Sequence, residues 1–244
     1  MKVALVLTGH LRCFDTIWEE TKRNFIDIIN PDIFAFTWND SMGNYLPPLQ
    51  TQHPDHHPGY NLESPPVLPE YLESVRERIN PKVFITESYM DHDAKFQAMV
   101  ESWRWVTGFL DVPAGGHRPK GCLGMVWSRS KIIQAKAAYE REHNIKYDAV
   151  VVTRWDVYHR AAIHNVLHVP DVINAAGAPD RHPWDYWTSG PNNLIDIWGQ
   201  QWDGMQELID INTFNTSPHL WQTNWFAHKN VPWAAIHNGT GIAR

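Results

Sequence analysis

The sequence lacks the features that mark nucleic-acid-binding, membrane-spanning and disulfide-stapled proteins. Its formal net charge is −6 and it has no basic block, so we expect no nucleic-acid partner. No stretch approaches 18 uninterrupted apolar residues, so we expect no membrane span. The two cysteines, Cys13 and Cys122, lie far apart in a chain of 244 residues. They form no disulfide framework, which favours a reduced, cytoplasmic setting.

Several catalytic and nucleotide-binding motifs are also missing. No G-x-G-x-x-G follows the first apolar run, and no G-x-x-x-x-G-K-[ST] is present, which argues against a dinucleotide fold and a P-loop. The absence of G-x-S-x-G and H-E-x-x-H argues against a serine-hydrolase elbow and a zinc-protease helix. Tryptophan, in contrast, is abundant, with 13 residues. Most of these must pack in the core, which leaves a few for stacking on flat ligands.

The first 155 residues predict an alternation of buried strands and helices. The apolar runs are nearly continuous, as in parallel strands that are covered on both faces. The predicted strands are 2–8, 32–38, 82–87 and 148–154. The predicted helices are 15–30, 69–80 and 124–144, with Asp15 as an N-cap and Trp18, Phe25, Ile28 and Ile29 on one face of the first. This order predicts an α/β fold with a mostly parallel central sheet flanked by helices.

Beyond residue 160 the pattern changes, with frequent Pro, Asn, Trp and His and only short helices, predicted at 194–209 and 218–229. We interpret residues 157–244 as the second half of the same domain, so that 1–244 form a single domain. The segments 39–66 and 111–121 read as long loops, which in compact domains are functional lids or disordered.

Polar residues follow the predicted strands at their carboxyl ends, where open α/β sheets bind ligands. Thr8, Gly9 and Arg12 follow the first strand, and Arg154 and Asp156 follow the fourth. Two further strands end near Asp40 and Glu87. Arginine binds phosphate in bidentate fashion, and a carboxylate suits a hard divalent cation. This edge of the sheet is therefore predicted to hold an activated phosphate compound.

The segments VALVLTGHLRCFDTIWEETKRNFIDIINPDIFAFTW and YDAVVVTRWDVY, joined by a long helix, resemble the nucleotide-sugar-dependent glycosyltransferases of GT-A type. The viral and bacterial members that act in surface-glycan synthesis are the most similar. The resemblance implies a Rossmann-like single domain, with 1–156 as the nucleotide-sugar-binding half and 157–244 as the acceptor-side half. It implies a nucleotide-diphosphate sugar as donor, a glycan or glycoconjugate as acceptor and Mn²⁺ or Mg²⁺ at the diphosphate. The location would be the cytoplasm, or the host cytoplasm if the protein is viral.

The resemblance also implies roles for individual residues. Asp156 matches the second carboxylate of the Asp-x-Asp motif, but Arg stands at position 154, so a metal, Arg154 or both could hold the diphosphate. The expected catalytic residues are Asp185 and Asp156. The expected donor-binding residues are Thr8, Gly9, Arg12, Ser128, Lys131 and Arg154. The expected metal ligands are Asp156 and His237.

Structural interpretations of the same residues stay open. Arg154 could form an ion pair, Asp156 could cap the next element, and a lone histidine such as His237 is usually structural. The alternative function is a non-catalytic carbohydrate-binding protein derived from a transferase fold. A nucleotidyltransferase that consumes a nucleoside triphosphate is a third possibility.

Overall fold

The computed structural model describes residues 1–11, 14–40, 67–103, 119–159, 171–177, 183–210, 218–236 and 240–242. The strands are β1 (Val3–Thr8), β2 (Asp32–Trp38), β3 (Val83–Glu87), β4 (Ala149–Arg154), β5 (Val157–His159), β6 (Ile173–Gly177), β7 (Pro183–Pro191), β8 (Trp233–Ile236) and β9 (Thr240–Ile242). The helices are α1 (Phe14–Thr21), α2 (Asp27–Ile29), α3 (Pro69–Ile79), α4 (Met90–Ser102), α5 (Pro119–His143), α6 (Asn192–Gly199), α7 (Met205–Asp210) and α8 (Pro218–His228). A π-helical segment, η1 (Lys22–Ile26), joins α1 to α2.

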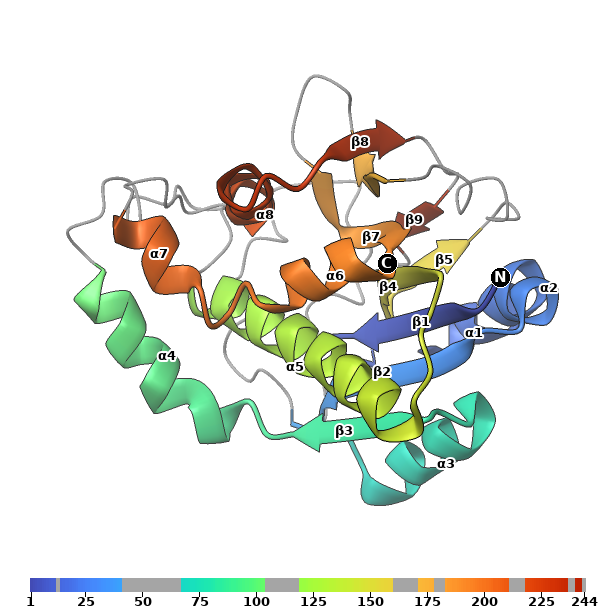
Figure 1. Cartoon of the computed structure of the whole chain (residues 1–244). Helices are drawn as coiled ribbons and strands as arrows, with labels where there is room; N and C mark the ends of the chain where they lie inside the picture. Colours follow the sequence, from blue (N-terminus) through green and yellow to red (C-terminus); the bar gives the residue numbers. More distant parts are fainter. Residues whose placement is uncertain are drawn as a thin grey trace, which may run out of the picture.

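The strands form a central sheet in the order β3-β2-β1-β4-β7-β6-β8, and β5 pairs with β9 in a second, two-stranded sheet (Figure 1). β1 pairs in parallel with β2 on one side and with β4 on the other. β7 runs antiparallel to both β4 and β6. The predicted α/β class with a mostly parallel sheet is therefore confirmed, as are the four strands expected in the first 155 residues.

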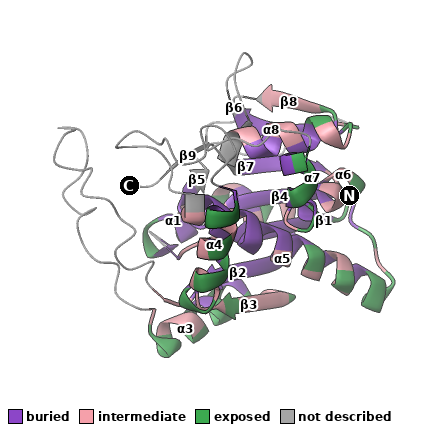
Figure 2. Ribbon diagram, turned by 90° about the vertical axis from the view of Figure 1, so that its left-hand side faces the viewer, coloured by how far each residue is buried: buried purple, intermediate pink, exposed green. Residues whose placement is uncertain are grey.

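The sheet is buried on both faces because its strands alternate between two hydrophobic clusters. Ala4 and Val6 of β1 face α5, which packs across β1, β2 and β3. Leu5 and Leu7 face the cluster that contains residues of α1, η1 and α3. Figure 2 shows the resulting layer of buried strands between partly exposed helices. The continuous apolar runs in the sequence thus follow from burial on both sides.

The first helical segment departs from the predicted pattern. Trp18 and Phe25 are buried as expected, but Ile28 is 52% exposed. The π-helical turn of η1 has more residues per turn than an α-helix, so the residues after it are rotated away from the predicted face. Asp15 lies inside the first turn of α1 rather than at its N-cap. Its carboxylate instead accepts hydrogen bonds from Tyr71 of α3 at 2.7 Å and from Arg78 of α3 at 2.5 Å.

Asparagine ends several helices in the left-handed conformation. Asn30 after α2 has φ 50°, Asn80 after α3 has φ 44° and Asn144 after α5 has φ 49°. Asparagine tolerates this conformation better than other residues with a side chain, so it substitutes for glycine at helix ends. The N–H of Asn80 donates to Arg76 O at 2.9 Å and closes the last turn of α3. Local signals of this kind define the bounds of the helices between the strands.

The second half of the chain completes the central sheet. β6, β7 and β8 extend it beyond β4, and none of these strands was expected from the sequence. The single helix predicted over 194–209 is two helices, α6 and α7, separated by a turn that contains Gly204. Hydrogen bonding between β4 and β7 joins this part of the chain to the first four strands. No helix in the described part of the chain is long and apolar enough to cross a membrane.

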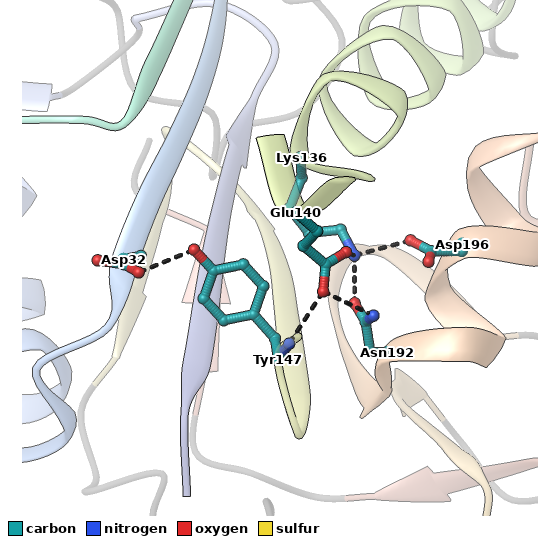
Figure 3. A network of polar contacts seen from close by, with 6 residues as sticks. All are labelled: Asp32, Lys136, Glu140, Tyr147, Asn192 and Asp196. Carbon is teal, nitrogen blue, oxygen red and sulfur yellow. Dashed lines mark hydrogen bonds and ion pairs between the residues drawn. The ribbon is translucent and has the colours of Figure 1, made fainter. Parts of the chain in front are cut away.

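A buried network ties α5 to α6 (Figure 3). Lys136 is fully buried and lies 2.9 Å from Glu140 Oε2 and 2.7 Å from Asp196 Oδ1. It also donates to Asn192 Oδ1, whose amide in turn donates to Glu140 Oε1 at 2.9 Å. Two carboxylates, one buried and one partly exposed, therefore share one buried ammonium group.

The same network continues to the amino-terminal edge of the sheet. The N–H of Tyr147, just before β4, donates to Glu140 Oε1 at 2.9 Å, and its hydroxyl donates to Asp32 Oδ2 at 2.8 Å. Burial raises the pKa of Asp196, although the ammonium opposes this shift. Burial also disfavours ionised Glu140, but its hydrogen bonds and the Lys136 charge outweigh that effect and lower the pKa of Glu140.

Candidate functional site

A pocket opens where the strand order of the sheet reverses. The chain proceeds from β1 to β2 and β3 on one side, and then β4 is added on the other side of β1. The crevice outside the carboxyl ends of β1 and β4 is therefore the place where open α/β sheets bind ligands. The pocket is lined by Thr8, Gly9, His10, Trp38, Gly121, Gly124, Met125, Ser128, Arg129, Arg154 and Asp156. The site predicted from strand ends thus coincides with an observed pocket.

Thr8 and Gly9 form the β1 side of this pocket. Thr8 is buried, and its hydroxyl donates to Ser128 Oγ of α5 at 3.1 Å. Gly9 has φ 103°, which strains any residue with a side chain, although a Cβ there would meet no atom within 4 Å. The glycine is thus required by the backbone turn rather than by crowding. The turn ends β1 beside Ser128, so three of the predicted donor-binding residues, Thr8, Gly9 and Ser128, line one pocket.

Arg154 and Asp156 form the β4 side. Arg154 pairs with Thr8 in the strand register, so the ends of β1 and β4 lie side by side. The guanidinium donates from Nε to Asp156 Oδ1 at 2.8 Å and from Nη2 to Oδ2 at 2.5 Å. The Arg154 side chain is 25% exposed, whereas that of Asp156 is 6% exposed. The pair is therefore bidentate, and its cation is more exposed than its carboxylate.

Trp155 anchors the turn between these two residues. Its indole Nε1 donates to Phe36 O of β2 at 2.7 Å, and its ring packs edge-on against Phe14 at a centroid distance of 5.7 Å. Trp155 therefore points away from Arg154 and Asp156, as strand alternation predicts. The turn is held from the side of the sheet opposite α5.

Arg129 of α5 is a pocket residue that the sequence reasoning missed. It is 1% exposed, donates from Nη2 to Gln201 Oε1 at 2.5 Å, and stacks 4.2 Å from the centroid of the Trp198 ring. The spacing of apolar residues could have indicated that Arg129 faces the interior, because it lies at helical spacing between the buried residues Val126 and Ile133. Among the described residues, the charged side chains in the lining are those of Arg129, Arg154 and Asp156. The two guanidiniums favour an anionic ligand.

Two other strand ends have structural partners instead. Asp40, after β2, accepts hydrogen bonds from Ser88 Oγ at 2.6 Å and from the N–H groups of Tyr89 and Met90 at 2.8 and 2.9 Å. It thereby satisfies the free N–H groups at the start of α4. Glu87, at the end of the next strand in the sheet, also has structural partners.

Glu87, at the end of β3, accepts from Trp127 Nε1 at 2.7 Å and contacts His92 Nε2 at 2.8 Å. Lys131, which was expected to contact the donor, places its ammonium 4.5 Å from the centroid of the Trp127 ring. Lys131 is not among the described residues that line the pocket. Ser128 is thus the member of the predicted α5 pair that faces the pocket.

Three predicted site residues cannot be placed. Arg12 and His237 lie outside the described residues. Asp185 belongs to β7, next to β4 in the sheet, but its side chain is also outside the described part. Their predicted roles remain predictions.

The described residues do not supply a complete set of ligands for a divalent cation. The pocket contributes one carboxylate, Asp156, and both of its oxygens accept hydrogen bonds from Arg154. Across the described ranges, no group of three or more His, Cys, Asp or Glu side chains is placed to hold a metal ion. The donor set seen here therefore does not fit the Mn²⁺ or Mg²⁺ that the sequence resemblance implies.

Comparisons with known proteins place the chain only coarsely. No protein-family model matches it, and no curated protein matches it by sequence. Among solved structures, the apo form of mouse xyloside xylosyltransferase 1 is similar with a TM-score of 0.46 and 7% sequence identity. The match covers 96% of this chain and 84% of that chain. A similarity this low supports no statement on activity. The fold itself is a mixed α/β domain with a seven-stranded, mostly parallel sheet flanked by helices.

Proposed function

We propose that the protein is a glycosyltransferase that moves a sugar from a nucleotide-diphosphate sugar to a glycan acceptor. The observation that carries this proposal is the pocket at the strand-order reversal between β1 and β4, with Arg154 and Arg129 in its lining. A site of this kind binds phosphates because it combines a glycine turn, which allows close backbone approach, with fixed positive charge. The resemblance of the sequence to GT-A glycosyltransferases, carried by the same strands, supports an activated sugar as the ligand.

The reaction makes two demands on the site. The bond between the sugar C1 and the diphosphate oxygen breaks, and the departing diphosphate must be stabilised by positive charge. The acceptor hydroxyl then needs a base to take its proton, which is the predicted role of Asp185. In the described residues the positive charge comes from Arg154 and Arg129. The sequence resemblance also implies a Mn²⁺ or Mg²⁺ ion held by Asp156 and His237, but the described donor set does not fit such an ion, so no step is assigned to it.

The size of the pocket fits part of a nucleotide sugar. Its volume is about 140 Å³, below the range of roughly 300–1,000 Å³ that is typical of sites for drug-sized ligands. The lining groups are those that a diphosphate needs, so we assign the diphosphate to this pocket. The base and the sugar would extend from it. A cytoplasmic location, suggested by the two separate cysteines, and a role in surface-glycan synthesis belong to the same proposal.

A thermal-shift panel of nucleoside diphosphates and nucleotide sugars tests this function. Ligand at a hundredfold excess over Kd stabilises the native state by about 2.7 kcal/mol, which raises Tm by roughly 5–10 °C for a chain of this size. We expect such a shift for one nucleotide class in the wild type and its loss in Arg154→Met. Lys146→Met, which changes an exposed lysine just before β4, serves as the control and should keep the shift.

Other outcomes would point to the alternatives. Glycan binding that nucleotides do not affect would favour a non-catalytic carbohydrate-binding protein, which the Arg at position 154 also suggests. Turnover of a nucleoside triphosphate would instead identify a nucleotidyltransferase. The absence of any shift with nucleotides would contradict the proposed transferase.

A further inference from the structure

The Arg154–Asp156 pair suits an anion better than a metal ion. Both residues line the pocket, and the Arg154 side chain is 25% exposed whereas that of Asp156 is 6% exposed. Arg154 is therefore the more accessible member of the pair. We infer that Arg154, positioned by Asp156, stabilises the departing diphosphate, and that sugar transfer by this protein needs no divalent metal ion. This inference rests on the proposed function and specifies how its site works.

The pair is built into rigid parts of the fold. Arg154 is the last residue of β4 and is paired with Thr8 of β1 in the sheet. The following residue, Trp155, is 2% exposed and donates its indole N–H to Phe36 O at 2.7 Å. The start and the middle of the turn are therefore held in place before a ligand arrives. Preorganised charge of this kind stabilises a transition state without reorganisation during the reaction.

Binding of a divalent cation by Asp156 would disrupt this arrangement. Both carboxylate oxygens already accept N–H groups of Arg154, at 2.8 and 2.5 Å. A metal ion on the same oxygens would lie beside the guanidinium, so the two positive charges would repel each other. Mg²⁺ usually takes one or two carboxylates in addition to substrate phosphates. Among the described residues of the pocket lining, the one carboxylate is that of Asp156, which already pairs with Arg154. The guanidinium thus already supplies positive charge to this carboxylate.

The inferred step balances without any redox partner. The bond between C1 and the diphosphate oxygen breaks, and its electron pair stays on that oxygen. The acceptor oxygen forms the new bond to C1 and passes its proton to a base. Negative charge grows on the diphosphate as its bond breaks, so its interaction with Arg154 strengthens toward the transition state. Arg129, buried in the same lining, adds a second fixed positive charge.

Titration calorimetry with inorganic pyrophosphate tests this inference on the full chain. We expect pyrophosphate to bind in EDTA with an affinity within about twofold of that in excess Mn²⁺. Arg154→Met should weaken binding by roughly 10- to 100-fold, as expected for loss of a hydrogen-bonded charge. Lys146→Met should bind as the wild type does. If pyrophosphate binds only with Mn²⁺, or if Arg154→Met binds it unchanged, the inference is wrong.

A double variant shows whether Asp156 acts through Arg154. If Asp156 only positions the guanidinium, Arg154→Met with Asp156→Asn should bind pyrophosphate no more weakly than Arg154→Met alone. If the two losses multiply, Asp156 has a role independent of Arg154 and the inference fails. The inference also fails if Mn²⁺ tightens wild-type binding tenfold and Asp156→Asn removes that gain, because Asp156 is then a metal ligand. Should Arg154→Met not fold, Arg154→Lys keeps the charge and loses the bidentate pairing. It is expected to bind with intermediate affinity.

The inference and the proposed function fail in different ways. Metal-free pyrophosphate binding that depends on Arg154, with no binding of any nucleotide sugar, would support the arginine-held diphosphate site and contradict the transferase. Sugar transfer that stops in EDTA and returns with Mn²⁺ would support the transferase and contradict the inference.

Discussion

Among the described charged residues outside the pocket, we expect replacement of the buried Lys136 to lower the stability of the fold most. Lys136→Met keeps the aliphatic stem and removes the ammonium group. Glu140 and Asp196, at 2.9 and 2.7 Å from Nζ, would then face each other without a shared cation (Figure 3). Loss of one partner of a buried ion pair costs about 3–5 kcal/mol. Because the Asp196 side chain is 31% exposed, we expect the low end, about 3 kcal/mol.

Urea denaturation followed by tryptophan fluorescence measures this loss. For a chain of this size, about 3 kcal/mol corresponds to a decrease in Tm of roughly 6–12 °C. The matched control is Lys146→Met, the same chemical change at an exposed lysine, which should alter stability by less than about 0.5 kcal/mol. Adding Asp196→Asn to Lys136→Met should recover part of the loss, since it removes one of the two unpaired carboxylates. A loss below about 1 kcal/mol for Lys136→Met would refute this reasoning.

Three further predictions concern packing, the pocket turn and acid sensitivity. Gly124→Ala should cost about 1–3 kcal/mol in urea unfolding, because its Cβ would lie 2.6 Å from Tyr89 Cε2. Gly121→Ala, three residues earlier, meets no atom within 4 Å and should stabilise α5 by up to about 1 kcal/mol; equal effects of the two changes would contradict this. Trp155→Phe should cost about 1–3 kcal/mol, because it removes the buried indole N–H that donates to Phe36 O of β2, and a stability equal to wild type would count against it. The lowered pKa of Glu140 contributes stability that is present above its unfolded pKa and lost as the pH falls through its folded pKa. Glu140→Gln should therefore flatten the acid side of a plot of urea midpoint against pH, and an unchanged slope would argue against it.

The first half of the fold could be predicted because its strands carry their own signal. β1 and β4 lie inside the sheet, so their apolar runs are uninterrupted and their residues are buried. β6 and β7 were missed because they are short or contain Pro and Gly, and their strand structure comes from pairing with β4 and with each other. The exposure of Ile28 was missed because a π-helical turn has no pattern of its own in the sequence.

The site was predicted in part for a similar reason. Parallel strands end at one edge, so Thr8 and Arg154 were expected to meet, and the β1–β4 register brings them together. The sequence alone could not show that Asp156 is engaged by Arg154, since that depends on the turn through Trp155. Nor did it separate Asp40, which caps α4, from the residues that line the pocket.

The most direct test of the proposed function is a transfer measurement with purified protein. A panel of nucleotide sugars is incubated with a glycan library, and glycosylated products are detected by mass spectrometry for the wild type and for Asp156→Ala. The proposal predicts a product from one nucleotide-sugar class with the wild type and none with Asp156→Ala, whose circular dichroism should match the wild type. No product from any donor, or full activity in the folded Asp156→Ala variant, would contradict it.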